Sequence, residues 1–387
     1  QVRNVISWTA LIAGYAQHGH GDEALILFEK MQRDGFHPNE VTFSCVLKAC
    51  GSIGALDKGK EIHQDISRRK SLGKDPLVGN ALVDMYAKCG EVVKAREVFN
   101  KLPIRDVISW TALISGYVQH GDGEEALNCF GQMLHGGFSP NSVTFLSVLN
   151  ACSNLGLLGK GKEIHNTIVR EGWLEKHALL GNALVDMYAK CGLLVKAQEV
   201  FDELSVRDVT SWTTLIAGYG QLGRDELAIE VFDKMLGEGM EPNVVTLTVM
   251  LNACSHSGLP DKCHKYYVVL STYYGIIPCL EHYACAVDLF SRAGRFDEAV
   301  MVIKKMPTCD YVPIWNALLG ACQRCGNVSL GKLAFEHAIE LDEKDAAPYV
   351  SMRNIYVSAS MQADADKIEL LRITNEAWME RECFSVE

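Results

Sequence analysis

The sequence has few basic residues for its length and no long apolar run. Its 37 Lys and Arg are outnumbered by 48 Asp and Glu, which gives the 387 residues a formal net charge of −11. Because non-specific nucleic-acid affinity comes mainly from Lys and Arg at phosphates, this charge argues against a general polyanion binder. Without a run of about 18 apolar residues, the sequence predicts no membrane span and no membrane partner. Any bound nucleic acid must therefore be recognised through specific contacts.

The sequence also lacks the patterns of a metal site. One CxxC is present, at Cys322 and Cys325, whereas zinc sites usually need two such pairs. Another group of possible ligands consists of Cys254, His256, Cys263 and His264. Cys254 is, however, the third copy of a repeated cysteine, after Cys50 and Cys152. We interpret such cysteines as small buried apolar residues in a reducing compartment, and we expect neither a metal nor a cofactor.

Two catalytic or nucleotide-binding signatures are incomplete. After Tyr311 the sequence has no His-x-Glu followed by Pro-Cys-x-x-Cys, which is the signature of zinc-dependent deaminases, so we expect no such enzyme activity. Three segments match G-x4-G-K, and they begin at Gly54, Gly156 and Gly326. None has the Ser or Thr that would hold magnesium, and none follows an expected strand. We therefore expect no nucleotide binding.

What the sequence does contain is a repeat. VISWTALIAGYAQHG at Val5 returns as VISWTALISGYVQHG at Val107 and as VTSWTTLIAGYGQLG at Val209, each 102 residues further on. GNALVDMYAKCG stands at Gly79 and again at Gly181, with the same offset. Three kinds of unit recur in rotation, and a period in the thirties for each unit predicts a solenoid.

Each unit is expected to be a helical hairpin. Trp8, Leu11, Ile12, Tyr15 and Ala16 follow the spacing of one helix face, and Ala24, Leu25, Leu27, Phe28 and Met31 that of a second. Gly19 and Gly21 are expected to end the first helix and Asp22 to cap the second. Gly35 and Pro38 then separate the hairpin from the next, which Asn39 opens.

Cutting at these signals gives nine units, whose lengths rotate through about 35, 36 and 31 residues. They are 5–39, 40–75, 76–106, 107–141, 142–177, 178–208, 209–243, 244–279 and 280–311. The rotation and the motifs SWTALI, VLNAC and GNALVDMYAKCG resemble the plant PLS-class pentatricopeptide repeat proteins. The resemblance implies an all-α, right-handed α–α superhelix of helical hairpins.

The segments outside the nine units also receive an interpretation. Residues 1–4 are expected to be the remnant of a preceding repeat, so that the chain is a fragment lacking its transit peptide. Residues 312–379 resemble the two tetratricopeptide-like extension hairpins of the E-type subclass, and they would cover the end of the core. Residues 380–387 only loosely resemble the short box expected after them and form a degenerate tail.

Two positions in each unit, the fifth residue and the last, carry the strongest functional signal. The same polar pair occurs in all three first-type units, and another pair occurs in the first two short units: Thr9 with Asn39, Thr111 with Asn141, Thr213 with Asn243, Asn80 with Asp106, and Asn182 with Asp208. Stacking of the hairpins is expected to bring the two members of each pair side by side. Hydroxyl, amide and carboxylate groups can hydrogen-bond a base edge, and helical repeats that read single-stranded RNA use two or three such side chains for each base.

By resemblance, Thr with Asn is an adenine reader and Asn with Asp a uracil reader. The alternative is that these residues only cap helices and form turns. Capping explains each last residue but not the recurrence of identical pairs, so we favour RNA reading. Four further pairs give no reliable base: Ser44 with Asp75, Leu146 with His177, Thr248 with Cys279, and Ala284 with Tyr311.

The second residue of most units is aliphatic, and by resemblance it would wedge between bases. These residues are Ile6, Val41, Leu77, Ile108, Val143, Leu179 and Val245. Chemically they could equally pack on the neighbouring hairpin. Thr210 and Glu281 break the pattern.

The function implied by the resemblance is recognition of a cytidine-to-uridine editing site in a plastid or mitochondrial transcript. The expected partners are single-stranded RNA of the form A-n-U-A-n-U-A followed by two weakly read bases, a DYW-type deaminase, and multiple-site editing-factor proteins. Two alternatives remain open at this stage. One is an RNA stability, splicing or translation factor, and the other is a tetratricopeptide-like scaffold that binds proteins.

Overall fold

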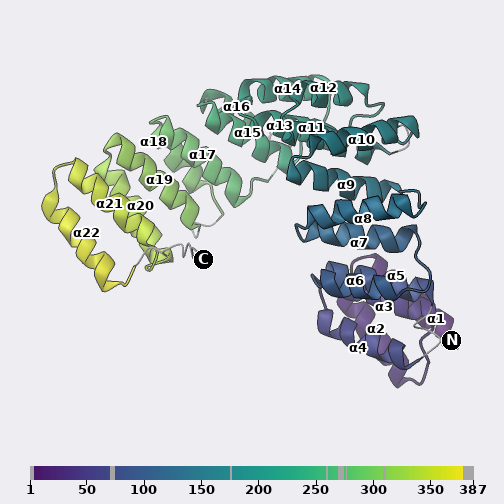
Figure 1. The fold of residues 1–387 in the computed structure, drawn as a ribbon. Helices are drawn as coiled ribbons and strands as arrows, with labels where there is room; N and C mark the ends of the chain where they lie inside the picture. Colours follow the sequence, from purple (N-terminus) through teal and green to yellow (C-terminus); the bar gives the residue numbers. More distant parts are fainter. Residues whose placement is uncertain are drawn as a thin grey trace, which may run out of the picture. The chain divides into compact units, whose positions relative to one another are not determined.

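The computed structural model describes residues 4–69, 75–174, 177–258, 260–268, 274–275, 277–307 and 311–377. All regular secondary structure in these residues is α-helical, and it forms 22 helices in eleven hairpins (Figure 1). The chain folds as two compact units, Gln1–Val206 and Arg207–Glu387. None of the described helices is long and apolar enough to cross a membrane.

The first unit holds six hairpins and the second holds five. The helices of the first are α1 (Val5–Gln17), α2 (Gly21–Arg33), α3 (Glu40–Ile53), α4 (Leu56–Arg68), α5 (Pro76–Lys88), α6 (Val92–Lys101), α7 (Val107–Gln119), α8 (Gly123–His135), α9 (Ser142–Leu155), α10 (Leu158–Arg170), α11 (Ala178–Lys190) and α12 (Leu194–Glu203). Those of the second are α13 (Val209–Gln221), α14 (Asp225–Gly237), α15 (Val244–His256), α16 (Pro260–Val268), α17 (Leu280–Arg292), α18 (Phe296–Lys304), α19 (Val312–Cys325), α20 (Val328–Leu341), α21 (Ala346–Ser358) and α22 (Gln362–Thr374).

The odd-numbered helices form one layer in each unit. In the first unit each odd-numbered helix from α1 to α11 packs against the next, and in the second unit the helices from α13 to α21 do the same. Each also packs against the even-numbered helix of its own hairpin. This arrangement explains why the fifth residue of one hairpin meets the start of the next, because both lie at the beginning of adjacent odd-numbered helices.

The apolar stripes fill the space between these layers. Trp110 of α7 is buried, and its ring lies 4.5 Å from that of Phe99 in α6, measured between centroids. Burying one large apolar side chain stabilises the fold by about 1.5–3 kcal/mol. The stripe prediction is confirmed for Trp8 and Ile12, which are buried, and is wrong for Leu11 and Tyr15, which are exposed. Their equivalents in α7, Leu113 and Tyr117, are buried. The difference arises because α5 covers this face of α7, while no described helix precedes α1.

One predicted cap is wrong. Helix α2 begins at Gly21 with His20 as its N-cap, and no side chain caps it, so Asp22 lies in the first turn instead. Gly21 therefore starts the second helix rather than ending the first. A Cβ atom at Gly21 would lie 2.4 Å from Cγ2 of Ile53, and this crowding explains why glycine occupies the position. The expectation for Gly35 is confirmed, since its φ of 82° is the left-handed conformation that favours glycine.

The C-terminal hairpins continue the core of the second unit. Tyr283, Phe290, Trp315 and Tyr349 belong to one buried apolar cluster that runs from α17 to the residues after α22. Trp315 stacks on His337 of α20, with ring centroids 4.4 Å apart. The expected tail at 380–387 lies outside the described residues, as do residues 1–3 of the expected remnant at 1–4, whereas Asn4 caps α1.

Candidate nucleic-acid interface

The last residue of each strongly signalled unit caps the first helix of the next unit. Asn39, Asp106, Asn141, Asp208 and Asn243 each have an extended backbone, and the Oδ1 atom of each accepts the backbone N–H of the third residue that follows, at 2.8–2.9 Å. The capping alternative therefore describes a real contact. It also fixes the orientation of the asparagine side chains. Because Oδ1 accepts from the helix, the Nδ2 group remains able to donate a hydrogen bond to another group.

In the first-type units the fifth residue reaches the cap through a third side chain. Thr9 Oγ1 lies 2.6 Å from Oγ1 of Thr42, whose hydroxyl donates to Asn39 Oδ1 over 2.8 Å. The same group recurs twice, with distances of 2.7 and 3.0 Å for Thr111, Thr144 and Asn141, and of 2.8 and 3.0 Å for Thr213, Thr246 and Asn243. The two members of each predicted pair are thus brought together through a bridging threonine rather than by a direct hydrogen bond.

In the first short unit the pair is in direct contact. Asn80 Nδ2 donates to both carboxylate oxygens of Asp106, at 3.1 and 2.9 Å. Within the described residues no group donates a hydrogen bond to Asn80 Oδ1, which is buried. A buried acceptor without a partner is costly, so an N–H group that reached this atom would be bound favourably. In the second such pair, Asn182 belongs to the compact unit Gln1–Val206 and Asp208 to the compact unit Arg207–Glu387. Asn182 is buried, and Asp208 caps α13.

The weaker pairs differ from one another. Asp75 caps α5 by accepting the backbone N–H groups of Leu77 and Val78, and the fifth residue of its unit, Ser44, is buried. Leu146 is half-buried, whereas His177 has no side-chain cap contact and packs against Trp173.

The last two weaker pairs lie in the second compact unit, Arg207–Glu387. Thr248 Oγ1 lies 2.7 Å from Nε2 of His282, and His282 Nδ1 accepts the backbone N–H of Cys279 at 2.9 Å. Here a histidine occupies the bridging position. Ala284 and Tyr311 pack against the C-terminal apolar core.

The second residues of the units form a series of exposed aliphatic side chains. All seven are 44–75% exposed, and they are Ile6, Val41, Leu77, Ile108, Val143, Leu179 and Val245. Packing on the neighbouring hairpin was the alternative to a ligand contact, and it covers only part of each of these side chains. Since the second and fifth residues are three apart on a helix, each exposed aliphatic side chain lies on the same face as the polar pair of its unit.

Sequence reasoning missed the bridging residue, which is the third residue of the following unit. Thr42, Thr144 and Thr246 are fully buried, and Ser109 and Ser211 hold the same place in two first-type units. A signal was present, because hydroxyl residues recur there at the fixed offset of 102 residues. It is also the signal of a capping box, which requires no ligand.

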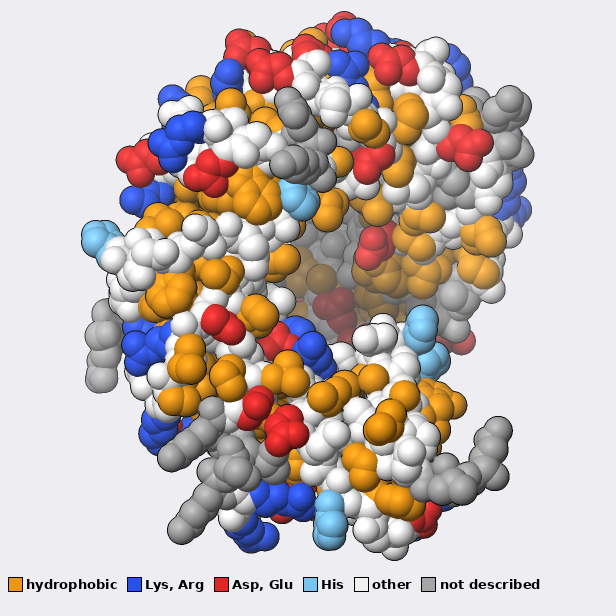
Figure 2. Space-filling model, turned by 90° about the vertical axis from the view of Figure 1, so that its right-hand side faces the viewer, with side chains coloured by type: hydrophobic (Ala, Val, Ile, Leu, Met, Phe, Trp, Pro, Cys, Tyr) orange, Lys and Arg blue, Asp and Glu red, His pale blue; other side chains and the backbone are white. Residues whose placement is uncertain are grey.

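The charge distribution matches the acidic composition. On the face drawn in Figure 2, Lys and Arg side chains form small groups interspersed with acidic and hydrophobic ones. Among its described residues, this face therefore shows no large patch of Lys and Arg that could bind the phosphates of a nucleic acid.

The rejected signatures have structural explanations. Each of the three G-x4-G-K segments begins with a glycine that ends a helix in the left-handed conformation, with φ of 65–69°, at Gly54, Gly156 and Gly326. These glycines therefore terminate helices. Among the described residues no group of three metal-binding side chains is close enough to hold an ion. Cys254 is buried, and burial raises the pKa of its thiol to about 12. The side chains of His256 and Cys263 lie outside the described set.

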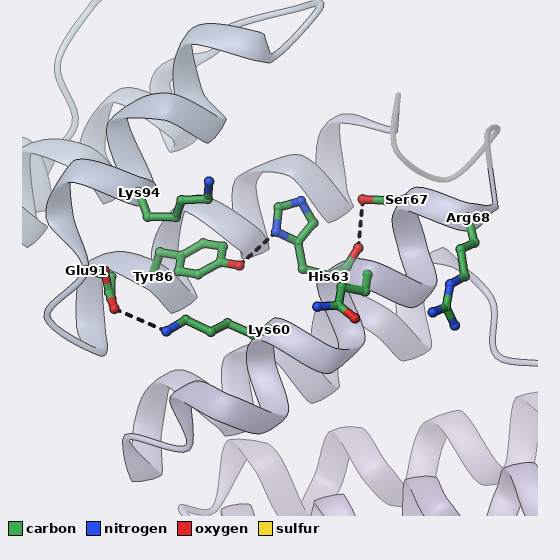
Figure 3. Close-up of a pocket in the computed structure, with 8 residues that line it drawn as sticks. Lys60, His63, Ser67, Arg68, Tyr86, Glu91 and Lys94 are labelled. Atoms are coloured by element: carbon green, nitrogen blue, oxygen red, sulfur yellow. Dashed lines mark hydrogen bonds and ion pairs between the residues drawn. The ribbon is translucent and has the colours of Figure 1, made fainter.

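A pocket of about 750 Å³ lies between α4, α5 and α6 (Figure 3), and no residue of the polar pairs lines it. Its His63 Nδ1 lies 2.8 Å from the Tyr86 hydroxyl, and His165 repeats this contact with Tyr188 at the same distance. Lys60 and Lys94, which also line the pocket, form ion pairs with Glu91 and Glu97. The compensated charges and the repeated ring contact indicate a packing feature.

These histidines predict loss of stability in mild acid. Burial, and after it the charges of nearby lysines, lowers the pKa of His63 and of His165 below the ordinary value of about 6.5. The unfolded chain then binds more protons than the folded chain, so the stabilisation is present above about pH 6.5 and is lost as the pH falls. We expect the urea midpoint to drop between pH 7 and pH 5. A His63→Phe, His165→Phe double variant should show a smaller drop in the urea midpoint. Replacing the exposed His135 by Phe should give the same drop as in the wild type. An equal drop in the double variant would contradict the assignment.

The fold and the repeated polar groups define a solenoid protein of helical hairpins. Residues 3–52, 105–154 and 207–256 match the PPR repeat family. Residues 80–107, 143–173, 182–209, 245–269 and 281–311 match the PPR repeat. The chain therefore belongs to the PPR repeat family.

Curated relatives agree with this family. The chain is 41% identical, over 95% of its length, to a putative mitochondrial pentatricopeptide repeat-containing protein of Arabidopsis thaliana. It is 40% identical, over 98% of its length, to the chloroplastic pentatricopeptide repeat-containing protein CRR2 of the same plant. The chain spans 59% of the length of each.

Among solved structures, PPR10 in complex with an 18-nt psaJ RNA element matches 96% of this chain and 61% of its own length. The TM-score is 0.67 and the sequence identity 19%. PPR10 from maize, in a second crystal structure, matches 95% of this chain and 58% of its own length, with a TM-score of 0.54 and 20% identity. At this identity the likeness shows the fold, a solenoid of helical hairpin repeats.

Proposed function

We propose that the chain binds single-stranded RNA, with one base for each repeat. The observation that carries the proposal is the recurrence, in one register, of an exposed aliphatic side chain beside a fixed polar pair. In the fourth unit these are Ile108 with Thr111 and Asn141. A base placed between successive aliphatic side chains would have its flat faces covered and its edge against the pair.

The proposed bases follow from the family resemblance of the polar pairs. Thr with Asn at units one, four and seven reads adenine, and Asn with Asp at units three and six reads uracil. The uracil assignment is supported by the unpartnered Oδ1 of Asn80, which can accept the ring N–H of uracil. With the first unit at the 5′ end, the RNA is A-n-U-A-n-U-A followed by two weakly read bases.

The biological role that we propose is recognition of a cytidine-to-uridine editing site in plastid or mitochondrial RNA. It is supported by the resemblance of residues 312–379 to E-type extension hairpins and by relatives named as chloroplastic or mitochondrial. The edited cytidine would lie four nucleotides 3′ of the base on the ninth unit, 280–311. A DYW-type deaminase would act in trans, together with multiple-site editing-factor proteins.

Crosslinking of the chain to cellular RNA, followed by sequencing of the bound fragments, tests this role. We expect fragments that hold the proposed pattern upstream of an edited cytidine. Bound sites with the pattern but no edited cytidine would favour a stability, splicing or translation role. Capture of peptides without RNA would favour the scaffold.

The chain itself is expected to leave cytidine unchanged, because it lacks the zinc ligands and the general acid of the deaminase signature. Incubation of the purified chain with target RNA, with elemental analysis of the same sample, provides the measurement. Conversion of cytidine, or one tightly bound zinc ion for each chain, would contradict the expectation.

Binding should also depend only weakly on salt. A chain of net charge −11 that holds RNA through base contacts releases few counterions, so the logarithm of affinity should fall gently with the logarithm of salt concentration. Fluorescence anisotropy between 50 and 300 mM salt gives the slope. A slope that corresponds to about ten neutralised phosphates would show that the backbone dominates binding.

A further inference from the structure

The bridging threonines are placed where they can control a reader without touching the ligand. Thr42, Thr144 and Thr246 are fully buried, yet each contacts both members of its Thr–Asn pair. The contact occurs three times, twice in the compact unit Gln1–Val206 and once in the compact unit Arg207–Glu387. Helix capping alone requires only the link between the bridging residue and the asparagine, and the link to the fifth residue is additional.

Counting protons shows what the bridge does. A threonine hydroxyl has one proton to donate, while the side-chain carbonyl of asparagine can only accept. In the fourth unit Thr144 therefore gives its proton to Asn141 Oδ1 over 3.0 Å, and its oxygen remains an acceptor for Thr111. Because the proton of Thr144 is committed, the 2.7 Å contact is a hydrogen bond only when Thr111 donates to Thr144, and the backbone carbonyl of Val107, 2.6 Å from Thr111 Oγ1, competes for the same proton.

The pair consequently has a fixed polarity. With its proton donated within the protein, Thr111 has only lone pairs left to offer a ligand, whereas Asn141 has the N–H groups of Nδ2. A base edge that offers a donor beside an acceptor matches this arrangement, as the amino group and ring nitrogen of adenine do. Guanine offers the reverse order, a carbonyl beside a ring N–H.

We infer that Thr42, Thr144 and Thr246 are positioning residues that set the hydrogen-bond polarity of the adenine-reading pairs. The inference rests on the proposed function and adds a specificity determinant outside the fifth and last residues. It predicts that selectivity is lost when a buried hydroxyl is removed, even though both residues that face the base are kept.

The matched control comes from the third unit. Ser109 holds the same capping position, but its hydroxyl donates to the backbone carbonyl of Asp106 at 2.8 Å, and the Asn80–Asp106 contact is direct. Removing the Ser109 hydroxyl should weaken the cap of α7 and leave uracil selectivity at the third position unchanged.

The experiment compares affinities of Thr144→Val, Thr144→Ser and Ser109→Ala for RNAs that differ only at the third or fourth base. We expect Thr144→Val to reduce the adenine-over-guanine ratio at the fourth position about five-fold, as the loss of one hydrogen-bonded contact implies. Discrimination at the other positions should stay constant, and Thr144→Ser should behave as the wild type. Thr42→Val and Thr246→Val apply the same change to the first and seventh positions, so the test does not depend on the folding of one variant.

Three results would overturn the inference. They are an unchanged ratio in the valine variants, a uniform loss of affinity at every position, and an equal loss of selectivity in Ser109→Ala. A wild-type chain with no preference for adenine at the fourth position would instead refute the proposed function itself, so the two failures are distinguishable.

Discussion

The Asn141→Asp variant is expected to shift its preference at the fourth RNA position from adenine toward guanine. The substitution replaces the outward Nδ2 donor by a carboxylate oxygen, which accepts hydrogen bonds only and so fits a ring N–H. A wrong base costs about 1–3 kcal/mol in protein–DNA complexes, so we expect the adenine-to-guanine preference ratio to change by about 5- to 150-fold. Binding to RNAs that differ only at this base provides the measurement.

The substitution should leave the fold unchanged, because aspartate caps helices as well as asparagine does. Asp106 and Asp208 already cap the equivalent helices of other units. Asn39→Asp provides a matched control, since it should alter the first position and leave the fourth as it is. Continued preference for adenine in the Asn141→Asp variant would show that the register or the base reading is wrong.

The Gly116→Ala variant is expected to lower the free energy of unfolding by about 1–3 kcal/mol, the usual cost of overpacking a core. A Cβ atom at this position would lie 2.5 Å from Cβ and 3.3 Å from Cα of Ala87 in the adjacent helix α5. Because Ala87 has no flexible side chain that could move away, α5 and α7 would have to separate. Urea denaturation followed by circular dichroism measures the loss.

Gly131→Ala is the control for this variant. Gly131 lies within α8, and no atom lies within 4 Å of the place where its Cβ would be. Here alanine should stabilise the chain by about 0.5–1 kcal/mol, because glycine loses more conformational freedom in a helix. If both variants had the same stability as the wild type, the close approach of α5 and α7 would be contradicted.

The hairpin architecture was predictable because its signals are local. Glycine in the left-handed conformation follows the ends of many helices, as at Gly35, and the odd-numbered helices start at the residues where the units were cut, from Val5 to Leu280. Local reasoning failed at Asp22, because α2 already begins at Gly21, where a Cβ atom would collide with Ile53. That contact joins two hairpins, so no spacing within one hairpin reveals it.

The geometry of the polar pairs was less predictable. The sequence places Thr9 with Asn39 and Asn80 with Asp106 at the same two positions, yet only the second pair makes a direct hydrogen bond. Side-chain length explains the difference, because the amide group of asparagine extends further than a threonine hydroxyl. The gap left by threonine is filled by the hydroxyl of the next unit, such as that of Thr42.

Selection of RNA ligands from a random pool by the purified chain tests the central claim most directly. We predict that the bound molecules share adenine at positions one, four and seven and uracil at positions three and six, in that 5′ to 3′ order, with the second and fifth positions free. Bound RNA without this spacing, or no retention of RNA above that of the free pool, would contradict the account.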